Sequence, residues 1–372
     1  MSEPKLRLER LTLSGFKTIR ELDALELGPM NVLIGPNGAG KSNLLSFFRM
    51  LSQMFAPPGN LQFFIGKAGG ANTQLYGGAT TAQEIQALLN FPGVDYQFRL
   101  AHAAPDTLIF AEEEISCRPP SDDETNRISW IHWGGGHREA IVLQADNLPF
   151  VVGEEALKTF LRECIVHQFH NTSETARIRQ RWSVSDGLAL KEDAANLAPF
   201  LLRIREQRPA HYRRIAETLR QIAPFFADFE LVPENDTVLL RWREKGNDLV
   251  FGPHQASDGT LRAMALVALL MQPADEMPLI ILLDEPELGL HPRAISVLAG
   301  LLQTASLHTQ VIVATQSPVL LDHFEPEQVI VAEREGSESV FRRLDRFKLE
   351  SWLEEYTLSD LWDKNVLGGR PR

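Results

Sequence analysis

A glycine-rich stretch near the start of the chain has the residue types and spacing of a loop that binds phosphate. It reads Gly35-Pro36-Asn37-Gly38-Ala39-Gly40-Lys41-Ser42 and fits the pattern GxxxxGK[ST]. Glycines let backbone N–H groups approach phosphates, and the N-terminus of a following helix favours negative charge. We expect Lys41 to reach the β and γ phosphates of ATP and Ser42 to bind Mg²⁺. The alternative is a glycine-rich turn, which the flanking predicted strand and helix disfavour.

Two acidic residues at the end of a hydrophobic run could supply the chemistry of hydrolysis. Asp284 and Glu285 follow the apolar stretch 279–283, which predicts a buried strand. At the carboxyl edge of a sheet, both carboxylates would lie beside the phosphate loop. We expect Asp284 to hold Mg²⁺ through water and Glu285 to activate the attacking water as a general base. By itself, such a pair can also simply lead into a helix.

Two further polar groups have spacing that suits phosphate contacts. Ser257, Asp258 and Gly259 begin a predicted helix 27 residues before Asp284, where a hydroxyl and free N–H groups could meet a phosphate. Taken alone, they are also an ordinary helix cap. Gln316 follows a predicted strand 32 residues after Asp284. Its amide can donate to a γ phosphate but cannot titrate as histidine does, so the rate of hydrolysis stays open.

The elements that must position these residues form a mixed α/β pattern. A predicted strand ends at Ile34 and a helix covers 42–54, on either side of the phosphate loop. After residue 261 strands alternate with helices, which predicts a parallel sheet with helical cover. The other expected segments are strands at 96–100, 107–110 and 128–133 in an antiparallel side sheet, helices at 155–165 and 194–223, strands within 229–251, strands at 310–314 and 329–331, and helices at 293–306 and 349–356.

The composition is that of a folded protein without a membrane segment. Apolar residues make up 44% of the 372 residues and charged residues 23%, which predicts a soluble globular chain. Cys117 and Cys164 form no CxxC pair, so we expect reduced thiols rather than disulfides or zinc. No signal peptide is recognisable, and no run approaches the ~18 apolar residues of a spanning helix. We therefore predict a cytoplasmic protein that does not bind membranes.

The order of these motifs resembles that of ABC-type ATPases. A phosphate loop, a Ser-x-Gly helix start, a strand with Asp-Glu and a later polar strand end occur in that order. The resemblance implies an α/β ABC-type ATPase head with a mostly parallel core sheet, Asn43 beside the nucleotide, and ATP and Mg²⁺ as cofactors. It also implies a homodimer in which ATP is sandwiched between subunits and Ser257 and Gly259 act in trans. Leu290 and His291 resemble the loop after the catalytic acids, although His291 could equally begin a helix.

The N-terminal stretch Leu13-Ser14-Gly15-Phe16-Lys17 narrows the resemblance to the SMC and RecF class of AAA-family ATPases. In that class a basic residue at this point approaches the nucleotide, although Lys17 could also be a solvated turn residue. Gln62 and Gln74 lie in the region where members often place a sensing glutamine; neither is thereby identified as an adenine contact.

The spacing between motifs predicts a compact second lobe. Ser42 and Ser257 are 215 positions apart, where the resemblance implies roughly a hundred in a transporter. Four prolines interrupt the stretch, which argues against the coiled-coil arms of SMC proteins. We predict a nucleotide-binding lobe from 1–150 and 229–345, a mostly helical insertion at 151–228 and a tail at 346–372.

Charge restricts any contact with nucleic acid to a local surface. The chain has a net charge of -12, whereas the segment 176–222 holds ten basic and five acidic residues. Roughly seven phosphate contacts would suffice for sequence-independent DNA binding there. Alternatively, these arginines decorate solvated helix faces or pair with acids elsewhere. The basic residues are Arg177, Arg179, Arg181, Lys191, Arg203, Arg205, Arg208, Arg213, Arg214 and Arg220.

Three classes of function remain open from the sequence. The first is an ATP-gated dimer that acts on DNA in repair or genome maintenance. The second is an ATPase sensor in an antiviral module that controls a separate partner protein, such as a nuclease. The third is a metabolic kinase, which the Ser-x-Gly segment disfavours.

Overall fold

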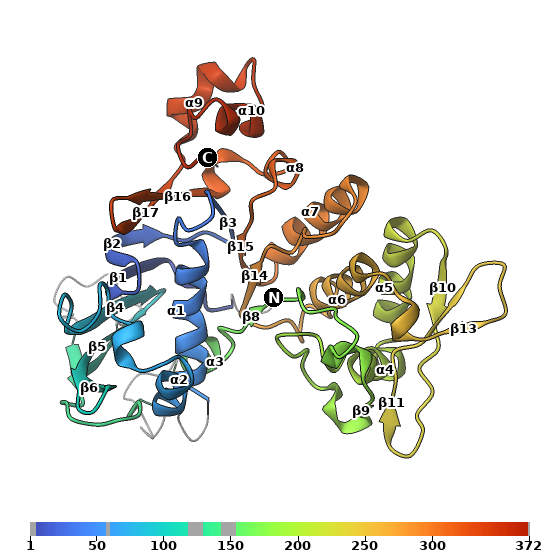
Figure 1. Cartoon of the computed structure of the whole chain (residues 1–372), viewed down its shortest axis with the longest axis horizontal. Helices are drawn as coiled ribbons and strands as arrows, with labels where there is room; N and C mark the ends of the chain where they lie inside the picture. Colours follow the sequence, from blue (N-terminus) through green and yellow to red (C-terminus); the bar gives the residue numbers. More distant parts are fainter. Residues whose placement is uncertain (1–4, 57–59, 118–128, 143–153, 371–372) are drawn as a thin grey trace. The chain divides into compact units, whose positions relative to one another are not determined.

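The computed structural model describes residues 5–56, 60–117, 129–142 and 154–370. The chain divides into two compact units, and each is described by itself (Figure 1). The first unit comprises 1–166, 278–282 and 325–372, and the second comprises 167–277 and 283–324. These units are defined by packing, and their limits differ from those of the predicted lobes, whose division stays a prediction.

An antiparallel sheet forms much of the first unit. Its strands follow the order β2-β1-β4-β5-β6-β7, and every pairing within it is antiparallel. In β5, Tyr96, Phe98 and Leu100 are fully buried, which is the period-two alternation expected of a strand with one covered face. The predicted side sheet is therefore present, although residue 128 lies outside the described residues. The strands are β1 (Arg10–Phe16), β2 (Ile19–Glu26), β4 (Glu84–Phe91), β5 (Val94–Ala103), β6 (Thr107–Cys117) and β7 (Ser129–His132).

The covered face of this sheet packs against helix α1 (Lys41–Met54). The Phe47 ring lies 5.7 Å from the Phe16 ring and 6.4 Å from the Phe98 ring, measured between centroids. Phe47, Phe48 and Leu51 recur at helical spacing and are fully buried. This contact fixes the helix that begins in the phosphate loop. Two further helices belong to the unit, α2 (Leu61–Lys67) and α3 (Glu154–Arg162).

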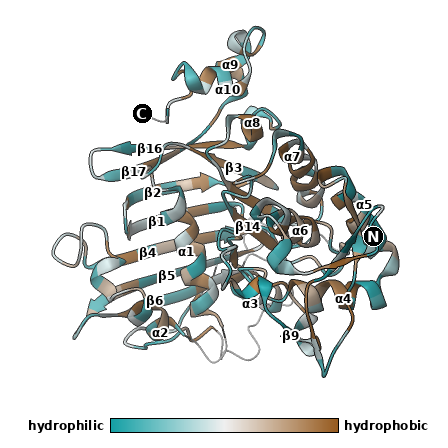
Figure 2. Cartoon of the chain, turned by 45° about the vertical axis from the view of Figure 1, so that its right-hand side comes forward, coloured by the Kyte–Doolittle hydropathy of each residue, from teal (hydrophilic) through white to brown (hydrophobic). Residues whose placement is uncertain are grey.

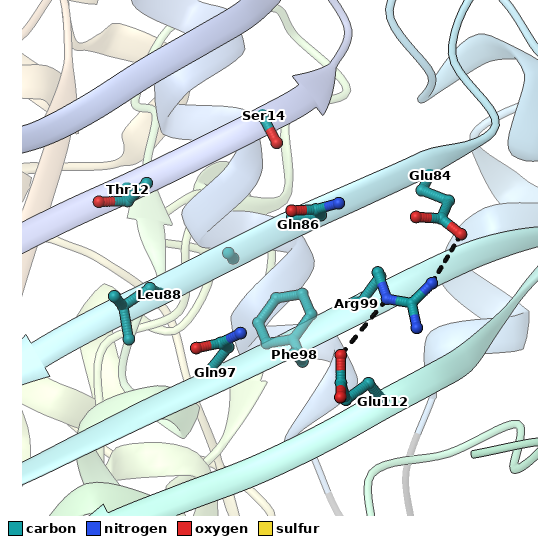
Figure 3. A pocket seen from close by; sticks show the side chains of 10 residues that line it. Thr12, Ser14, Glu84, Gln86, Leu88, Gln97, Phe98, Arg99 and Glu112 are labelled. Atoms are coloured by element: carbon teal, nitrogen blue, oxygen red, sulfur yellow. Dashed lines mark hydrogen bonds and ion pairs between the residues drawn. The ribbon is translucent and has the colours of Figure 1, made fainter. Parts of the chain in front are cut away.

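The opposite face of the sheet is polar and open (Figure 3). A depression of about 450 Å³ there has Arg99 as the one cation among its lining residues. The Arg99 guanidinium lies 2.8 Å from the Glu84 carboxylate and 3.4 Å from that of Glu112. Because both acids neutralise it, Arg99 does not turn this depression into an anion site.

A short parallel pair supports the phosphate loop. Strand β3 (Met30–Ile34) is fully buried and runs parallel to β16 (Val329–Glu335), with Val331 opposite Ile34. Strand β17 (Glu338–Arg343) pairs antiparallel with β16, and Figure 2 colours the strand ends beside their turn as hydrophilic. The chain then forms α9 (Arg346–Leu353) and α10 (Leu358–Asp363). The sequence predicted β16 and most of α9 but neither β17, half of whose residues are charged, nor α10, which has only six residues.

Helices dominate the second unit. Helix α6 (Asp258–Leu270) packs against α5 (Pro209–Ile222) and α7 (Pro292–Ser306). The predicted helix over 194–223 is wrong in one respect: it is two helices, α4 (Leu197–Gln207) and α5, because Pro209 begins a new helix after the non-helical Arg208. Helix α8 (Pro318–Leu321) follows strand β15 (Gln310–Ala314).

Small strands complete this unit. Strands β10 (Phe226–Phe229), β12 (Trp242–Glu244) and β13 (Val250–Phe251) form one sheet, and β9 (Trp182–Ser183) pairs with β11 (Thr237–Val238). Two strands run from one unit into the other along the chain, β8 (Val166–His167) and β14 (Ile280–Asp284).

Candidate nucleotide site

The phosphate loop joins β3 to α1 in the first unit. Asn37, Gly38 and Ser42 are exposed, whereas the Lys41 side chain is only 5% exposed. The Lys41 ammonium donates to the carbonyl oxygens of Gly35, at 2.6 Å, and Pro36, at 3.1 Å. The loop thus folds around its own lysine and presents its middle and its serine to solvent.

The shape of this loop suits the phosphates of a nucleotide. Gly38 has a φ of 79°, and no atom lies within 4 Å of the place where a Cβ would stand. The first turn of α1 contains no acidic residue, so the positive end of the helix is not neutralised there. An anion could therefore meet backbone N–H groups and the start of the helix without displacing a side chain.

Lys17 lies along α1 rather than in solvent. The Lys17 ammonium donates to the Ser46 hydroxyl at 2.5 Å, and the backbone N–H of Lys17 donates to the Gln74 carbonyl at 2.8 Å. Burial, together with the charge of Arg49, lowers the pKa of Lys17. This placement disfavours the solvated-turn alternative. Beside it, the Asn43 amide donates to the Thr18 hydroxyl at 2.7 Å, which ties the start of α1 to the β1–β2 turn.

Asp284, in the second unit, is held by two residues that the sequence did not single out. The Gln168 amide donates to its Oδ2 at 2.6 Å, and His170 Nε2 lies 3.0 Å from its carbonyl oxygen. The glutamines named from the sequence were Gln62 and Gln74. Gln62 instead donates to the carbonyls of Leu108 and Arg138 in the first unit. Gln168 follows a strand of only two residues, so no local pattern marks it.

Glu285 and Gln316, which the sequence assigned to the attacking water and to the γ phosphate respectively, lie in contact. The Gln316 amide donates to Glu285 Oε1, and the Glu285 N–H donates to the Ala314 carbonyl at 2.7 Å. Glu285 also has a φ of 45°, in the left-handed region that a residue with a side chain seldom adopts. Such strain persists only where the surroundings impose it, and it is common at functional sites.

A buried carboxyl, that of Glu287, accepts hydrogen bonds from the turn that carries Gln316. Glu287 is 9% exposed and accepts hydrogen bonds from the Thr315 hydroxyl, at 2.5 Å, and the Gln316 N–H, at 3.3 Å. Burial raises the pKa of Glu287. Its role is to fix the turn that carries Gln316. No local pattern marks this contact, because it joins residues 28 and 29 positions apart.

The Ser-x-Gly segment begins α6 and is accessible. Ser257 is exposed and caps the helix by accepting from the Thr260 N–H at 3.2 Å. The Arg179 guanidinium, 7% exposed, donates to the Asp258 carboxylate at 3.2 Å and to the Pro253 carbonyl. Ser257 therefore acts as an ordinary helix cap within its own chain. A role of Ser257 and Gly259 at the nucleotide of a second subunit stays a proposal. His291 likewise caps α7 by accepting from the Arg293 N–H at 3.3 Å.

Comparison with known proteins gives the family. A family model described as "AAA domain, putative AbiEii toxin, Type IV TA system" matches residues 30–133 and 155–322. The chain belongs to this family. No curated protein matches the chain.

Solved structures similar to this AbiEii-type AAA protein show its fold. An Smc head bound to the C-terminal winged-helix domain of ScpA matches with a TM-score of 0.56 and 16% identity, covering 94% of this chain and 100% of that one. An Smc head with an extended coiled coil, bound to the C-terminal domain of ScpA derived from Pyrococcus furiosus, gives 0.55 and 14%, covering 94% and 99%. The predicted class, an α/β P-loop ATPase head of the ABC and SMC type, is confirmed.

The donor groups of this AAA protein suit Mg²⁺ rather than a softer metal. Ser42 offers a hydroxyl and Asp284 a carboxylate, both hard oxygen ligands. Within the described residues no group of three or more His, Cys, Asp or Glu is placed to hold a metal. Mg²⁺ accepts such oxygen ligands together with waters and nucleotide phosphates. In the same part of the chain, no helix is long and apolar enough to cross a membrane.

Most basic side chains of the segment 176–222 in this AAA protein already have partners within the chain. Arg205 and Arg220 donate to backbone carbonyls, and the Lys191 ammonium lies over the Trp182 ring. Among the described residues, Arg213 and Arg214 are the members of the segment that are exposed and make no ion pair. Five others pair with acids: Arg177 with Asp193, Arg179 with Asp258, Arg181 with Glu234, Arg203 with Glu276, and Arg208 with Asp275 and Glu276.

We predict that the buried His167, next to Gln168, makes the stability of the protein depend on pH. Burial lowers its pKa from 6.5 to about 4, so the folded protein disfavours the protonated form. Between pH 6.5 and pH 4 this histidine is protonated in the unfolded chain but neutral in the folded protein. The free energy of unfolding therefore falls as the pH falls. From pH 7.5 to pH 5 this single group should cost about 2 kcal/mol.

The measurement is urea unfolding of the nucleotide-free protein and of His167→Gln at both pH values. The loss between them should be about 2 kcal/mol smaller in the variant, because glutamine does not titrate. Glu113, Glu163 and Glu287 have raised pKa values and act in the opposite direction, but they are common to both proteins. Equal losses in the two proteins would contradict the prediction.

Proposed function

We propose that the chain binds ATP with Mg²⁺ and hydrolyses it. The observation that carries this proposal is the pair Glu285 and Gln316. A protein that only bound a nucleotide would not need a strained carboxylate held against an amide at the end of a buried strand. The phosphate loop, with its exposed middle and buried lysine, supplies the place for the phosphates.

Each predicted residue has a distinct task in this proposal. Lys41 leaves the carbonyls that hold it and neutralises the β and γ phosphates, while loop N–H groups from Gly38 to Ser42 orient them. Ser42 and Asp284 would hold Mg²⁺, with Gln168 orienting the Asp284 carboxylate. The ion, when bound, neutralises charge on the phosphates.

Glu285 is proposed to accept a proton from the attacking water. Its contact with the Gln316 amide fixes the carboxylate, and Gln316 could then pass to the γ phosphate as a donor. Lys17, close to α1, would add positive charge near the nucleotide. Glu287 fixes the turn that carries Gln316 and takes no part in proton transfer.

Two subunits are proposed to close on two nucleotides. Ser257 and Gly259 stand at the accessible start of α6, where a hydroxyl and N–H groups could contact the phosphates bound by a second copy. ATP binding would then shift the protein from monomer to dimer, and hydrolysis would return it.

Release of phosphate from ATP by the purified chain tests the proposal. Hydrolysis should require Mg²⁺, stop with EDTA, and rise more steeply than the protein concentration if the dimer is the active form. A protein that binds ATP without any hydrolysis, at concentrations where it is dimeric, would overturn the assignment.

DNA is one candidate for what the dimer acts on. Arg213 and Arg214 lie exposed on α5, and a dimer would present both pairs. The neutralisation of their neighbours makes this surface smaller than the sequence predicted. Changing both residues to Glu should weaken DNA binding at least tenfold and reduce its dependence on salt, measured by fluorescence anisotropy.

The control for this experiment is Arg346→Glu with Lys348→Glu on α9, which changes the net charge by the same amount. Both residues are exposed and make surface ion pairs of little energetic weight. Equal DNA affinity in the two double variants would exclude 213 and 214 as the contact.

A sensor in a defence module is the second candidate. The description of the family names a toxin and a Type IV TA system, and this favours control of a separate effector over repair. Under this proposal, an effector co-purifies with the chain and its activity depends on whether the ATPase is locked with ATP. An ATPase stimulated by DNA and indifferent to any such effector would favour repair.

A further inference from the structure

The last described residues return to the phosphate loop within the first unit. After α10 the chain returns toward β16 (Figure 1). It passes through the buried Leu367 to Gly368 and Gly369, which lie against residues of β16. A methyl group on Gly369 would lie 3.1 Å from the Ala332 carbonyl oxygen and 3.5 Å from the Cα of Gly35. Gly35 is the first residue of the phosphate loop, so the tail lies beside the loop itself.

The Ala332 carbonyl lies between two glycines. A methyl group on Gly35 would come within 2.2 Å of that oxygen, and one on Gly369 within 3.1 Å. A residue with a side chain at position 35 or 369 would therefore force the neighbouring atoms to move. The middle of β16, the tail and the start of the phosphate loop are therefore packed closely together.

Two side chains hold the tail in this position. The Glu333 carboxylate accepts from the Gly369 N–H at 2.8 Å, and the indole of Trp362 donates to the Gly369 carbonyl at 2.7 Å. Trp362 is fully buried, so its hydrogen bond is shielded from water. Both polar groups of Gly369 are thus satisfied by residues outside the tail turn.

The carbonyl group of Gly35 links the tail to Lys41. Gly35, against which Gly369 packs, accepts the buried 2.6 Å hydrogen bond from the Lys41 ammonium. A shift of Gly35 would move that acceptor and redirect the N–H groups that follow it. We propose that Gly369, held by Glu333 and Trp362, is a positioning residue for the phosphate loop and sets the affinity for ATP. This inference rests on the proposed function.

A matched pair of glycine variants tests it. Gly369 and Gly336 have φ values of 61° and 60°, so alanine adds the same backbone strain at both. At Gly336, in the β16–β17 turn, nothing lies within 4 Å of the added methyl, whereas at Gly369 it would stand 2.7 Å from Val331 Cγ1. ATP titration of Gly369→Ala should give a Kd at least tenfold weaker than that of Gly336→Ala, with unfolding midpoints showing both proteins folded.

A second variant decides the outcome if Gly369→Ala does not fold. Glu333→Ala removes the acceptor for the Gly369 N–H, and its control is Glu335→Ala, an exposed residue of the same strand. Weaker ATP binding in the first but not the second supports the inference. ATP binding equal to that of the controls overturns it. A wild-type protein that does not bind ATP would instead overturn the proposed function and, with it, this inference.

Discussion

A Glu285→Gln protein is expected to bind ATP, remain dimeric and hydrolyse ATP about 10²–10⁴ times more slowly than the wild type, the usual contribution of a positioned general base. Glutamine keeps the size of the side chain and an oxygen that can accept from the Gln316 amide, but it cannot take a proton from water. Binding and dimerisation should therefore survive while turnover slows.

Light scattering with ATP and Mg²⁺, with and without a gapped DNA, measures whether the variant is dimeric. Phosphate release measures its rate of hydrolysis. The Lys41→Ala protein serves as the control that should stay monomeric in ATP. A Glu285→Gln protein that is monomeric in saturating ATP would contradict the dimer mechanism, and one with normal turnover would exclude Glu285 as the base.

Replacement of Lys41 by Ala is expected to weaken ATP binding by about 10² or more. The ammonium supplies charge-assisted hydrogen bonds to phosphate, which together contribute about 3 kcal/mol. Removing it also leaves the carbonyls of Gly35 and Pro36 without the donor they share. The loop would then lose both its cation and the contact that shapes it.

Titration with a fluorescent ATP analogue gives the Kd of this variant. Lys67→Ala is the matched control, because Lys67 is exposed at the end of α2 and carries the same charge. Its Kd should equal that of the wild type. Unchanged binding in Lys41→Ala would exclude the loop as the nucleotide site, whatever the fate of Glu285.

Local patterns predicted the elements that carry the candidate site. The glycine spacing, the apolar run before Asp284 and the helical period after Ser42 each lie within a short window, where backbone preference and burial act together. For this reason the strand end at Ile34 and the helices α1 and α7 agree with prediction. The break at Pro209 lies inside a longer stretch of helical spacing, which by itself predicts one continuous helix.

Only the tertiary structure decided which distant residues meet. Gln168 contacts Asp284 across 116 positions, and the pairing of the arginines in 176–222 depends on acids such as Asp258, Asp275 and Glu276 that lie outside the segment. The contact of Gly369 with Gly35 joins opposite ends of the sequence. Periodicity records which side of an element is buried but not which other element covers it. The sequence by itself therefore determined the phosphate loop and the acids, and packing decided what surrounds them.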